Sequence, residues 1–344
     1  MIRPRKLQVG DTVATISLSW GGAGALPHRY QAGKRQLAET FGVRVVETRH
    51  ALKPADWIYR HPEARAQDLM EAFADPNIKA IISNIGGDDS IRTLPFVDPA
   101  VIRANPKIFL GFSDTTVTHL CCYQAGLTSF YGTSILVGFA ENGGMHEYQI
   151  RDLRKTLFQA EPIGQIHPNP QGWTSERLEW ANPENQPIHR TLQPASGWRW
   201  LQGSGLHQGH LLGGCVEVLD FLKGTPILPS LEQWKGAIAF FETSEEQMPP
   251  HLFLRFLRSL VAMGVLAELR GIILGRPHDD EHWQAYDQAL IQIVREEEGL
   301  SELPIVTGMD FGHTCPTFTL PYGVQAQLDC EQRTFSLVES GVSA

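Results

Sequence analysis

The chain has 344 residues, of which 42% are hydrophobic and 19% are charged, a balance typical of a soluble globular protein with room for two domains. Its formal net charge of −9 disfavours a nucleic-acid partner, because no basic stripe is present to neutralise phosphates. Five scattered cysteines do not form a disulfide framework, so we expect a cytoplasmic protein. No apolar run has the length of a signal-peptide core or a membrane span, so we expect no membrane partner.

The first half of the chain alternates predicted strands with predicted helices. Gly42 ends the first helix, and Pro62 begins the second at a position where its missing N–H does no harm. This alternation predicts an α/β fold with a Rossmann-like N-terminal domain over residues 1–163, built on a parallel sheet. Ligands of such sheets bind beyond the carboxyl ends of the strands. The predicted strands are 12–17, 43–48, 80–83 and 108–110, and the predicted helices are 28–41, 62–74 and 117–123.

A different composition marks residues 164–205, which are rich in Pro, Asn, Gln and Trp and show weak periodicity. We interpret this stretch as an interdomain linker, and its length indicates that it contributes to a site or an interface. A second α/β domain is predicted over residues 206–344. Its predicted strands are 236–242, 271–274 and 304–307, its predicted helices are 249–263 and 283–298, and a hairpin is predicted over 324–337.

The segment 111–116 reads Gly-Phe-Ser-Asp-Thr-Thr and lies between a predicted strand and a predicted helix. A serine at such a sharp turn is raised above the sheet, and the next backbone N–H points toward a forming oxyanion. The pattern departs from Gly-x-Ser-x-Gly, because Thr115 stands at the last glycine position. Ser113 is therefore a candidate nucleophile, and an ordinary helix N-cap formed by Ser113 or Asp114 is the alternative.

A serine nucleophile needs a base and an acceptor that orients the base. His313 follows a glycine in a turn just after a predicted strand, where it is either held at a site or part of the polar surface. Glu242 ends the apolar strand 236–242, where its carboxylate either orients an imidazole or caps the next turn. The residues alone leave both alternatives open.

Paired glycines, Gly86 and Gly87, follow another predicted strand. Because glycine permits close backbone approach, this turn is half of an oxyanion hole, a phosphate cradle or merely a tight turn. The lysine and hydroxyl pattern of a P-loop is missing here, which disfavours the phosphate cradle.

Two further patterns fail the tests for a cofactor or metal site. Residues 22–24 resemble the start of a dinucleotide fingerprint, and Glu47 lies at a suitable spacing for a ribose contact, but Pro27 replaces the third glycine. His278 and His282 are four residues apart, yet the preceding proline favours a solvated loop over the helix that a metal pair would need. We expect neither a cofactor nor a metal.

Together, five segments resemble the LD-carboxypeptidase family of serine peptidases, which includes the microcin C immunity peptidases. The resemblance runs over nearly the whole chain, and the joint order and spacing are more specific than any one segment. In chain order the segments are Gly86-Gly87 with Leu94-Pro95, Gly111-Phe-Ser-Asp-Thr-Thr116, Gly209-His-Leu-Leu-Gly-Gly214, Ala239-Phe-Phe-Glu-Thr-Ser-Glu-Glu246, and Gly312-His313 with Leu320-Pro-Tyr-Gly323.

The resemblance implies roles for the matching positions. Ser113 would be the nucleophile, Glu242 the orienting acid and His313 the general base, with an oxyanion hole formed by the backbone amides of Asp114 and the Gly86–Gly87 turn. It implies cleavage of an amide bond next to a free carboxylate, no metal or cofactor, and a homodimer. The substrate would be a peptidyl or aminoacyl nucleotide, as in the microcin-immunity branch, or alternatively a murein tetrapeptide.

Two positions bear on substrate choice. The microcin-immunity branch has a lysine four residues after the catalytic acid that reads an acidic group, whereas Glu246 stands there in this chain. That branch also stacks a linker aromatic on a nucleotide base, a role open to Trp180, which is alternatively a buried interface residue. Two other function classes compete with the serine peptidase, namely a non-catalytic binder on the same fold and a nucleotide-dependent oxidoreductase, which the missing third glycine disfavours.

Overall fold

The first sheet is mostly parallel, as the alternation of strands and helices predicted. The computed structural model describes residues 1–344 and places six strands in the order β12-β5-β4-β3-β1-β2. All neighbours are parallel except β12 and β5, which pair antiparallel. The strands are β1 (Thr12–Ile16), β2 (Arg44–Glu47), β3 (Ile78–Ser83), β4 (Ile108–Gly111), β5 (Phe130–Tyr131) and β12 (Leu320–Pro321).

Helices flank this sheet and follow the predicted pattern closely. The predicted helix 62–74 has the observed bounds of α4, and Gly42 ends α2 in the left-handed conformation with φ of 68°. The helical elements are α1 (Gly22–Ala25), α2 (Pro27–Phe41), α3 (Ala55–Arg60), α4 (Pro62–Ala74), η1 (Ser90–Phe96), α5 (Pro99–Ala104), η2 (Ser113–Thr115), α6 (Thr116–Gln124), η3 (Ile135–Phe139) and α7 (Glu147–Phe158).

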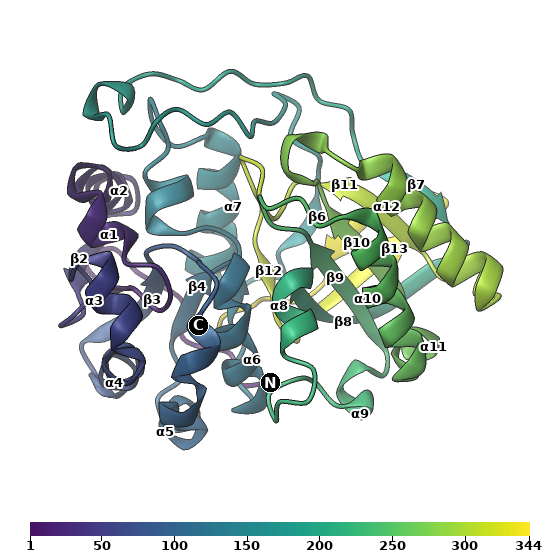
Figure 1. Cartoon of the computed structure of the whole chain (residues 1–344), viewed down its shortest axis with the longest axis horizontal. Coiled ribbons are helices and arrows are strands. Elements are labelled where there is room, and N and C mark those ends of the chain that lie inside the picture. The colour runs from purple at the N-terminus through teal and green to yellow at the C-terminus, as the bar shows by residue number, and fades with distance from the viewer.

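A second, eight-stranded sheet forms the other half of the molecule (Figure 1). Its order is β6-β14-β13-β8-β9-β10-β11-β7, with a parallel centre from β8 to β11 and antiparallel flanks. The mixed α/β fold expected from the sequence is confirmed in both halves. The strands are β6 (Gly164–Ile166), β7 (Arg199–Gln202), β8 (Leu206–Cys215), β9 (Ala237–Glu242), β10 (Gly271–Gly275), β11 (Ile305–Met309), β13 (Gln325–Asp329) and β14 (Thr334–Leu337).

The helices of the second half cover this sheet, and the longest predicted one is interrupted. The stretch predicted as one helix over 283–298 begins as an α-helix and continues from Ile291 as a π-helix. The helical elements are η4 (Pro183–Asn185), α8 (Val216–Phe221), α9 (Leu231–Trp234), α10 (Pro250–Ala262), α11 (Val265–Glu268), η5 (His278–Asp280), α12 (Trp283–Leu290) and η6 (Ile291–Glu297). No helix combines the length and the apolar character needed to cross a bilayer.

The two halves share a core. The largest apolar cluster has 48 buried residues and joins Val117 and Leu120 of α6 to strands of the second sheet. The two halves approach each other closely at Gly214 of β8, because a Cβ there would lie 2.5 Å from Thr116 Cγ2 in the first half. The nucleophile turn is therefore packed directly against the second half.

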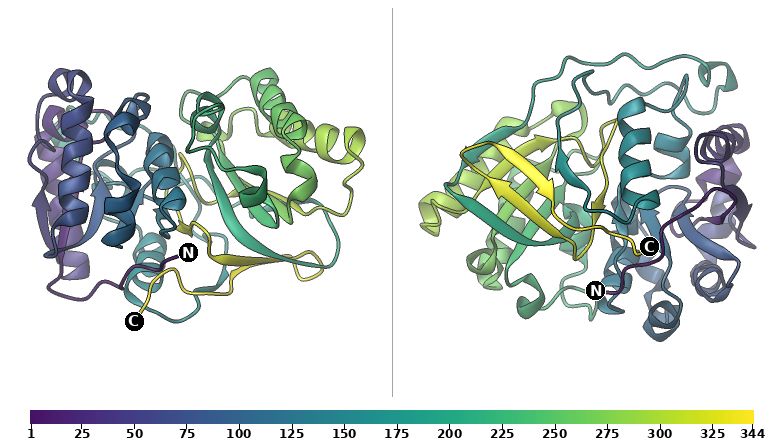
Figure 2. Two further views of the ribbon diagram at one scale, coloured as in Figure 1. Left: turned by 90° about the horizontal axis from the view of Figure 1, so that it is seen from below. Right: turned by 180° about the vertical axis from the view of Figure 1, so that it is seen from behind.

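Residues 164–205 cross over both halves as a long, mostly irregular segment (Figure 1). Its ends supply β6 and β7, which form the two edges of the second sheet and which weak sequence periodicity did not reveal. The two chain ends lie close together beside the first half (Figure 2), where the Lys6 N–H donates to the Ser343 carbonyl at 2.9 Å.

Candidate active site

Ser113 sits on the strand-to-helix turn that its sequence predicts. It follows the carboxyl end of β4 and adopts φ of 62°, a conformation uncommon for a residue other than glycine. A Cβ on Gly111 would come within 2.6 Å of Thr115 Oγ1, so the absence of a side chain there lets the turn close tightly. Such backbone strain concentrates where a side chain must be presented for chemistry.

Tyr131 at the end of β5 forms a hydrogen bond with this turn. The backbone N–H of Ser113 donates to the Tyr131 hydroxyl at 2.9 Å. The same hydroxyl donates a short hydrogen bond to Oε1 of Glu242. The phenol is fully buried, and burial together with the neighbouring Glu242 raises its pKa well above the usual value, so it stays a neutral donor. One hydroxyl thus connects the serine turn to the carboxylate.

His313 lies between Ser113 and Glu242. Its Nδ1 is 2.6 Å from Glu242 Oε2, and its Nε2 is 3.0 Å from Ser113 Oγ. The carboxylate of Glu242 is completely buried at the end of β9. The three side chains, which are 71 to 200 residues apart in the sequence, thus form one continuous hydrogen-bonded chain.

The glycine before the histidine has a structural reason. Gly312 has φ of 94°, and a Cβ there would lie 2.8 Å from both Glu242 Cβ and Oε2. Both the left-handed backbone and the lack of space require glycine. This close approach fixes the position of the His313 turn relative to the Glu242 side chain.

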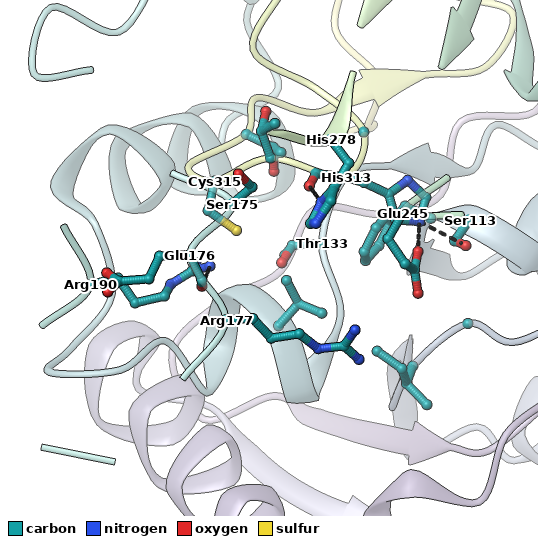
Figure 3. A pocket seen from close by; sticks show the side chains of 18 of the residues that line it. Ser113, Thr133, Ser175, Glu176, Arg177, Arg190, Glu245, His278, His313 and Cys315 are labelled. Atoms are coloured by element: carbon teal, nitrogen blue, oxygen red, sulfur yellow. Dashed lines mark hydrogen bonds and ion pairs between the residues drawn. The ribbon is translucent and has the colours of Figure 1, made fainter. Parts of the chain in front are cut away.

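Glu245 places a second carboxylate beside the same histidine. Its Oε2 is 3.0 Å from His313 Nε2, and its side chain is 49% exposed at the pocket (Figure 3). Burial alone would lower the pKa of His313, but Glu242 and Glu245 raise it well above the usual value. The hydrogen bond from His313 lowers the pKa of Glu245 to about 2.

The Gly86–Gly87 turn borders the serine. A Cβ on Gly86 would lie 3.0 Å from Ser113 Oγ and 3.3 Å from the backbone nitrogen of Asp114. The Asp114 side chain does not cap the helix but accepts from the Ser90 N–H at 2.8 Å, which ties the serine turn to the glycine turn. The backbone amides of Asp114 and Gly87 are therefore carried by adjacent, mutually braced turns, as an oxyanion hole requires.

These residues open onto a pocket of about 810 Å³, which includes its mouth. Residues of the crossing segment 164–205, among them Arg177 and Arg190, form one wall, and Figure 3 shows Arg190 close to Glu176 and away from His313 and Ser113. Trp180 also lines this pocket and is half-buried, with the Arg29 guanidinium 4.2 Å from its ring. Trp180 therefore lies at the pocket and also packs against the apolar core of the first half, while its stacking on a base stays a prediction.

The sequence patterns set aside earlier have other structural uses. Residues 22–25 form a short helix, where a Cβ on Gly24 would lie 2.2 Å from the Lys53 carbonyl. Glu47 accepts from the Tyr30 hydroxyl and from Lys34. No group of three or more His, Cys, Asp or Glu side chains is arranged to hold a metal ion.

The sequence analysis missed several residues at or beside the candidate site. Tyr131 lies on a two-residue strand that carries no periodic signal. Glu245, three residues beyond Glu242, was quoted in a motif without a role, although its spacing from the acid was the available signal. His278, interpreted as part of a solvated loop, instead lines the pocket with its Nδ1 3.1 Å from the His313 carbonyl oxygen.

Comparison with known proteins agrees with this architecture. A model of the LD-carboxypeptidase N-terminal domain matches residues 13–132, and a model of the LD-carboxypeptidase C-terminal domain matches residues 208–328. The microcin C7 self-immunity protein MccF of Escherichia coli is 28% identical over 341 residues, covering 98% of this chain and 96% of that protein.

Solved structures match over nearly the whole length. An MccF-like protein from Streptococcus pneumoniae in complex with AMP superposes with a TM-score of 0.86 at 33% identity, covering 95% of this chain and 98% of that one. MccF in complex with glutamyl sulfamoyl guanosine gives a TM-score of 0.83 at 27% identity and covers all of both chains. With both domain models matched in order and a 33% identical relative along its length, the chain belongs to the LD-carboxypeptidase family of peptidases.

Proposed function

We propose that the chain is a serine carboxypeptidase or amidase that uses Ser113, His313 and Glu242 as a catalytic triad. The observation that carries this proposal is the unbroken chain of hydrogen bonds from Ser113 Oγ through both imidazole nitrogens to the Glu242 carboxylate. The order nucleophile, base and orienting acid is the arrangement by which a weakly acidic hydroxyl becomes a nucleophile.

The proposed reaction follows from this geometry. His313 Nε2 accepts the hydroxyl proton as Ser113 Oγ attacks the scissile carbonyl carbon, while Glu242 stabilises the imidazolium. The amides of Asp114 and Gly87 donate to the carbonyl oxygen as it becomes negative. The imidazolium then protonates the leaving nitrogen, and water activated by His313 hydrolyses the acyl-enzyme.

For the substrate, we propose a peptidyl or aminoacyl nucleotide. Two solved relatives hold AMP or glutamyl sulfamoyl guanosine, and this chain matches each of them along its length. The half-buried Trp180 offers an aromatic wall at the pocket, which suits a nucleobase. The cytoplasmic location and the homodimer stay predictions.

A murein tetrapeptide is the second candidate. The guanidinium of Arg177 is exposed at the pocket, where it suits the free carboxylate at the end of such a peptide. The description of the family as LD-carboxypeptidases supports the same substrate class.

Hydrolysis of a glutamyl sulfamoyl nucleoside and of an LD-linked tetrapeptide should be measured with wild type and Ser113→Ala. We expect one substrate to be cleaved, the variant to lose about 10⁴-fold or more in kcat, and a fluorophosphonate probe to label wild type at Ser113 only. Folding of the variant is checked by its unfolding curve. Equal turnover by a folded Ser113→Ala variant, or absence of labelling together with absence of turnover, would contradict the proposal.

A further inference from the structure

Glu245 and Ser113 share one imidazole nitrogen. Both Glu245 Oε2 and Ser113 Oγ lie 3.0 Å from His313 Nε2, and Figure 3 shows the two contacts diverging from the same ring. A carboxylate only accepts hydrogen bonds, so a Glu245 oxygen at ion-pair distance favours a proton on Nε2. An imidazole with protons on both nitrogens cannot accept the serine proton.

The charges around His313 favour this protonated form. Glu242 contacts it from β9 and Glu245 from the loop that follows, while His278 of η5 contacts its backbone carbonyl. Arg177 lines the same pocket from the crossing segment. The carboxylates of Glu242 and Glu245, at 2.6 and 3.0 Å from the two ring nitrogens, favour the charged form, so the resting site holds an imidazolium. Turnover then requires that Glu245 leave Nε2 when the substrate binds.

A cationic group next to the scissile bond would draw Glu245 away. In an aminoacyl group with a free amine, the α-nitrogen is two bonds and about 2.5 Å from the carbonyl carbon that Ser113 attacks. A carboxylate within hydrogen-bond reach of Nε2 therefore also reaches an α-ammonium, whereas a side-chain ammonium on a four-carbon stem points elsewhere. Glu245 is half-exposed and belongs to a loop rather than to β9, so it has room to turn.

We propose that Glu245 is a specificity-determining residue that binds the free α-ammonium of the acyl residue, and that this exchange releases His313 to act as the base. The imidazolium gives its Nε2 proton to solvent, and the carboxylate takes the ammonium as its new partner. This inference rests on the proposed function and narrows its substrates to acyl groups with a free α-amine. A peptide whose amine at this position is acylated offers no ammonium, so Glu245 stays in contact with His313.

The kinetic test compares a glutamyl sulfamoyl nucleoside with its N-acetylated form. We expect wild type to prefer the free amine by about 10- to 100-fold in kcat/KM, the range set by a hydrogen bond to a charged group. Glu245→Gln should lose most of that preference. Glu161→Gln removes the same charge from an exposed loop residue that does not line the pocket and should keep the preference. An unchanged preference in Glu245→Gln, or an equal loss in Glu161→Gln, would overturn the proposal.

A second measurement needs no turnover, so its result is independent of the proposed function. The titration of His313 is followed by NMR of isotope-labelled histidine in wild type, Glu245→Gln and Glu161→Gln. We expect the imidazolium to persist to higher pH in wild type and Glu161→Gln than in Glu245→Gln. Adding glutamyl sulfamoyl nucleoside to the Ser113→Ala protein should shift the titration to lower pH, and the N-acetylated form should not. Identical titrations in all three proteins, or the same effect from both ligands, would refute the inference even if hydrolysis is observed.

Discussion

The hydroxyl of Tyr131 donates a hydrogen bond to the carboxylate of Glu242. The same oxygen accepts a hydrogen bond from the backbone N–H of Ser113. The phenol therefore fixes the position of the Glu242 carboxylate, which belongs to the second half, relative to the Ser113 turn of the first half. The proposed triad of Ser113, His313 and Glu242 is thus contacted by a fourth side chain that connects two of its members.

Tyr131→Phe should therefore reduce both stability and activity. It leaves the buried Ser113 N–H and Glu242 Oε1 without a partner, and we expect a loss of about 1–3 kcal/mol in the free energy of unfolding. We also expect kcat to fall by about tenfold or more, because the strained serine turn loses its anchor. Denaturant unfolding and steady-state kinetics measure the two effects. Tyr123→Phe, another buried tyrosine, should change neither, and equal effects of the two substitutions would contradict the bridging role.

The elevated pKa of His313 makes its stabilising contribution depend on pH. The pKa in the folded state lies well above the usual 6.5, so the stabilisation is fully present below pH 6.5 and is lost as the pH rises through the folded-state value. We expect His313→Gln to destabilise the protein more at pH 6 than at alkaline pH, by urea unfolding at matched ionic strength. A difference that grows as the pH rises would show that the histidine is held neutral.

In the same way, kcat/KM should increase with pH as His313 loses its proton and becomes a base. The ascending limb of the wild-type pH profile should lie above the usual histidine range, because Glu242 and Glu245 hold the imidazolium. The measurement is kcat/KM for hydrolysis of the preferred substrate across pH. A rate independent of pH through this region is incompatible with His313 as the general base.

Gly312→Ala tests the contact between the histidine turn and the acid. The new Cβ would lie 2.8 Å from Glu242 Cβ, so the two must separate, and a displacement of this kind lowers kcat by about 100-fold. Gly10→Ala is a matched control, since its φ of 89° is close to the 94° of Gly312 but nothing lies within 4 Å of the added carbon. The control should lose stability from backbone strain alone and retain kcat. Similar kcat values for the two variants would show that Gly312 has no special effect on the candidate site.

Arg190 anchors the crossing segment through Glu141. Their side chains are 13% and 1% exposed, and Arg190 Nε donates to Glu141 at 2.8 Å. Arg190→Ala removes the arginine from a buried carboxylate that keeps only the Asn142 N–H at 3.1 Å and His146 at 3.9 Å, so we expect a loss of about 3–5 kcal/mol and faster proteolysis within residues 164–205. Adding Glu141→Gln should recover part of that loss. Additive effects in this double-mutant cycle would show that the pair is not coupled.

Much of the fold could be predicted because local signals agree with the tertiary structure. Pro62 and Gly42 mark helix ends by backbone chemistry alone, and the buried strands of the first sheet are continuous apolar runs. The strands β6 and β7 gave no such signal, because edge strands of three and four residues take their conformation from the neighbours they pair with. The same holds for η6, where a π-helix follows an α-helix without a break in the apolar pattern.

The residues of the candidate site also differ in how far the sequence could predict them. Glu242 ends a predicted strand, Ser113 and His313 follow predicted strands, and the meeting of the three was expected from the family resemblance. Tyr131 and Glu245 act through distances that only the folded chain defines, since one spans the interface between the halves and the other turns back from a loop. The motifs and the family resemblance together therefore identified Ser113, Glu242 and His313 as candidates, but not the two side chains that contact them.

The pairing of β12 with β5 has a consequence for how the protein is made. Leu320 and Pro321 supply the outermost strand of a sheet whose other five strands are all complete by Tyr131. During translation, nearly 190 further residues, from 131 to 320, are added before the strand that pairs with β5 is synthesised. The glutamate that Tyr131 bonds and the histidine beside that glutamate also follow later, at positions 242 and 313, so the hydrogen bonds of the candidate site form only when translation is almost finished.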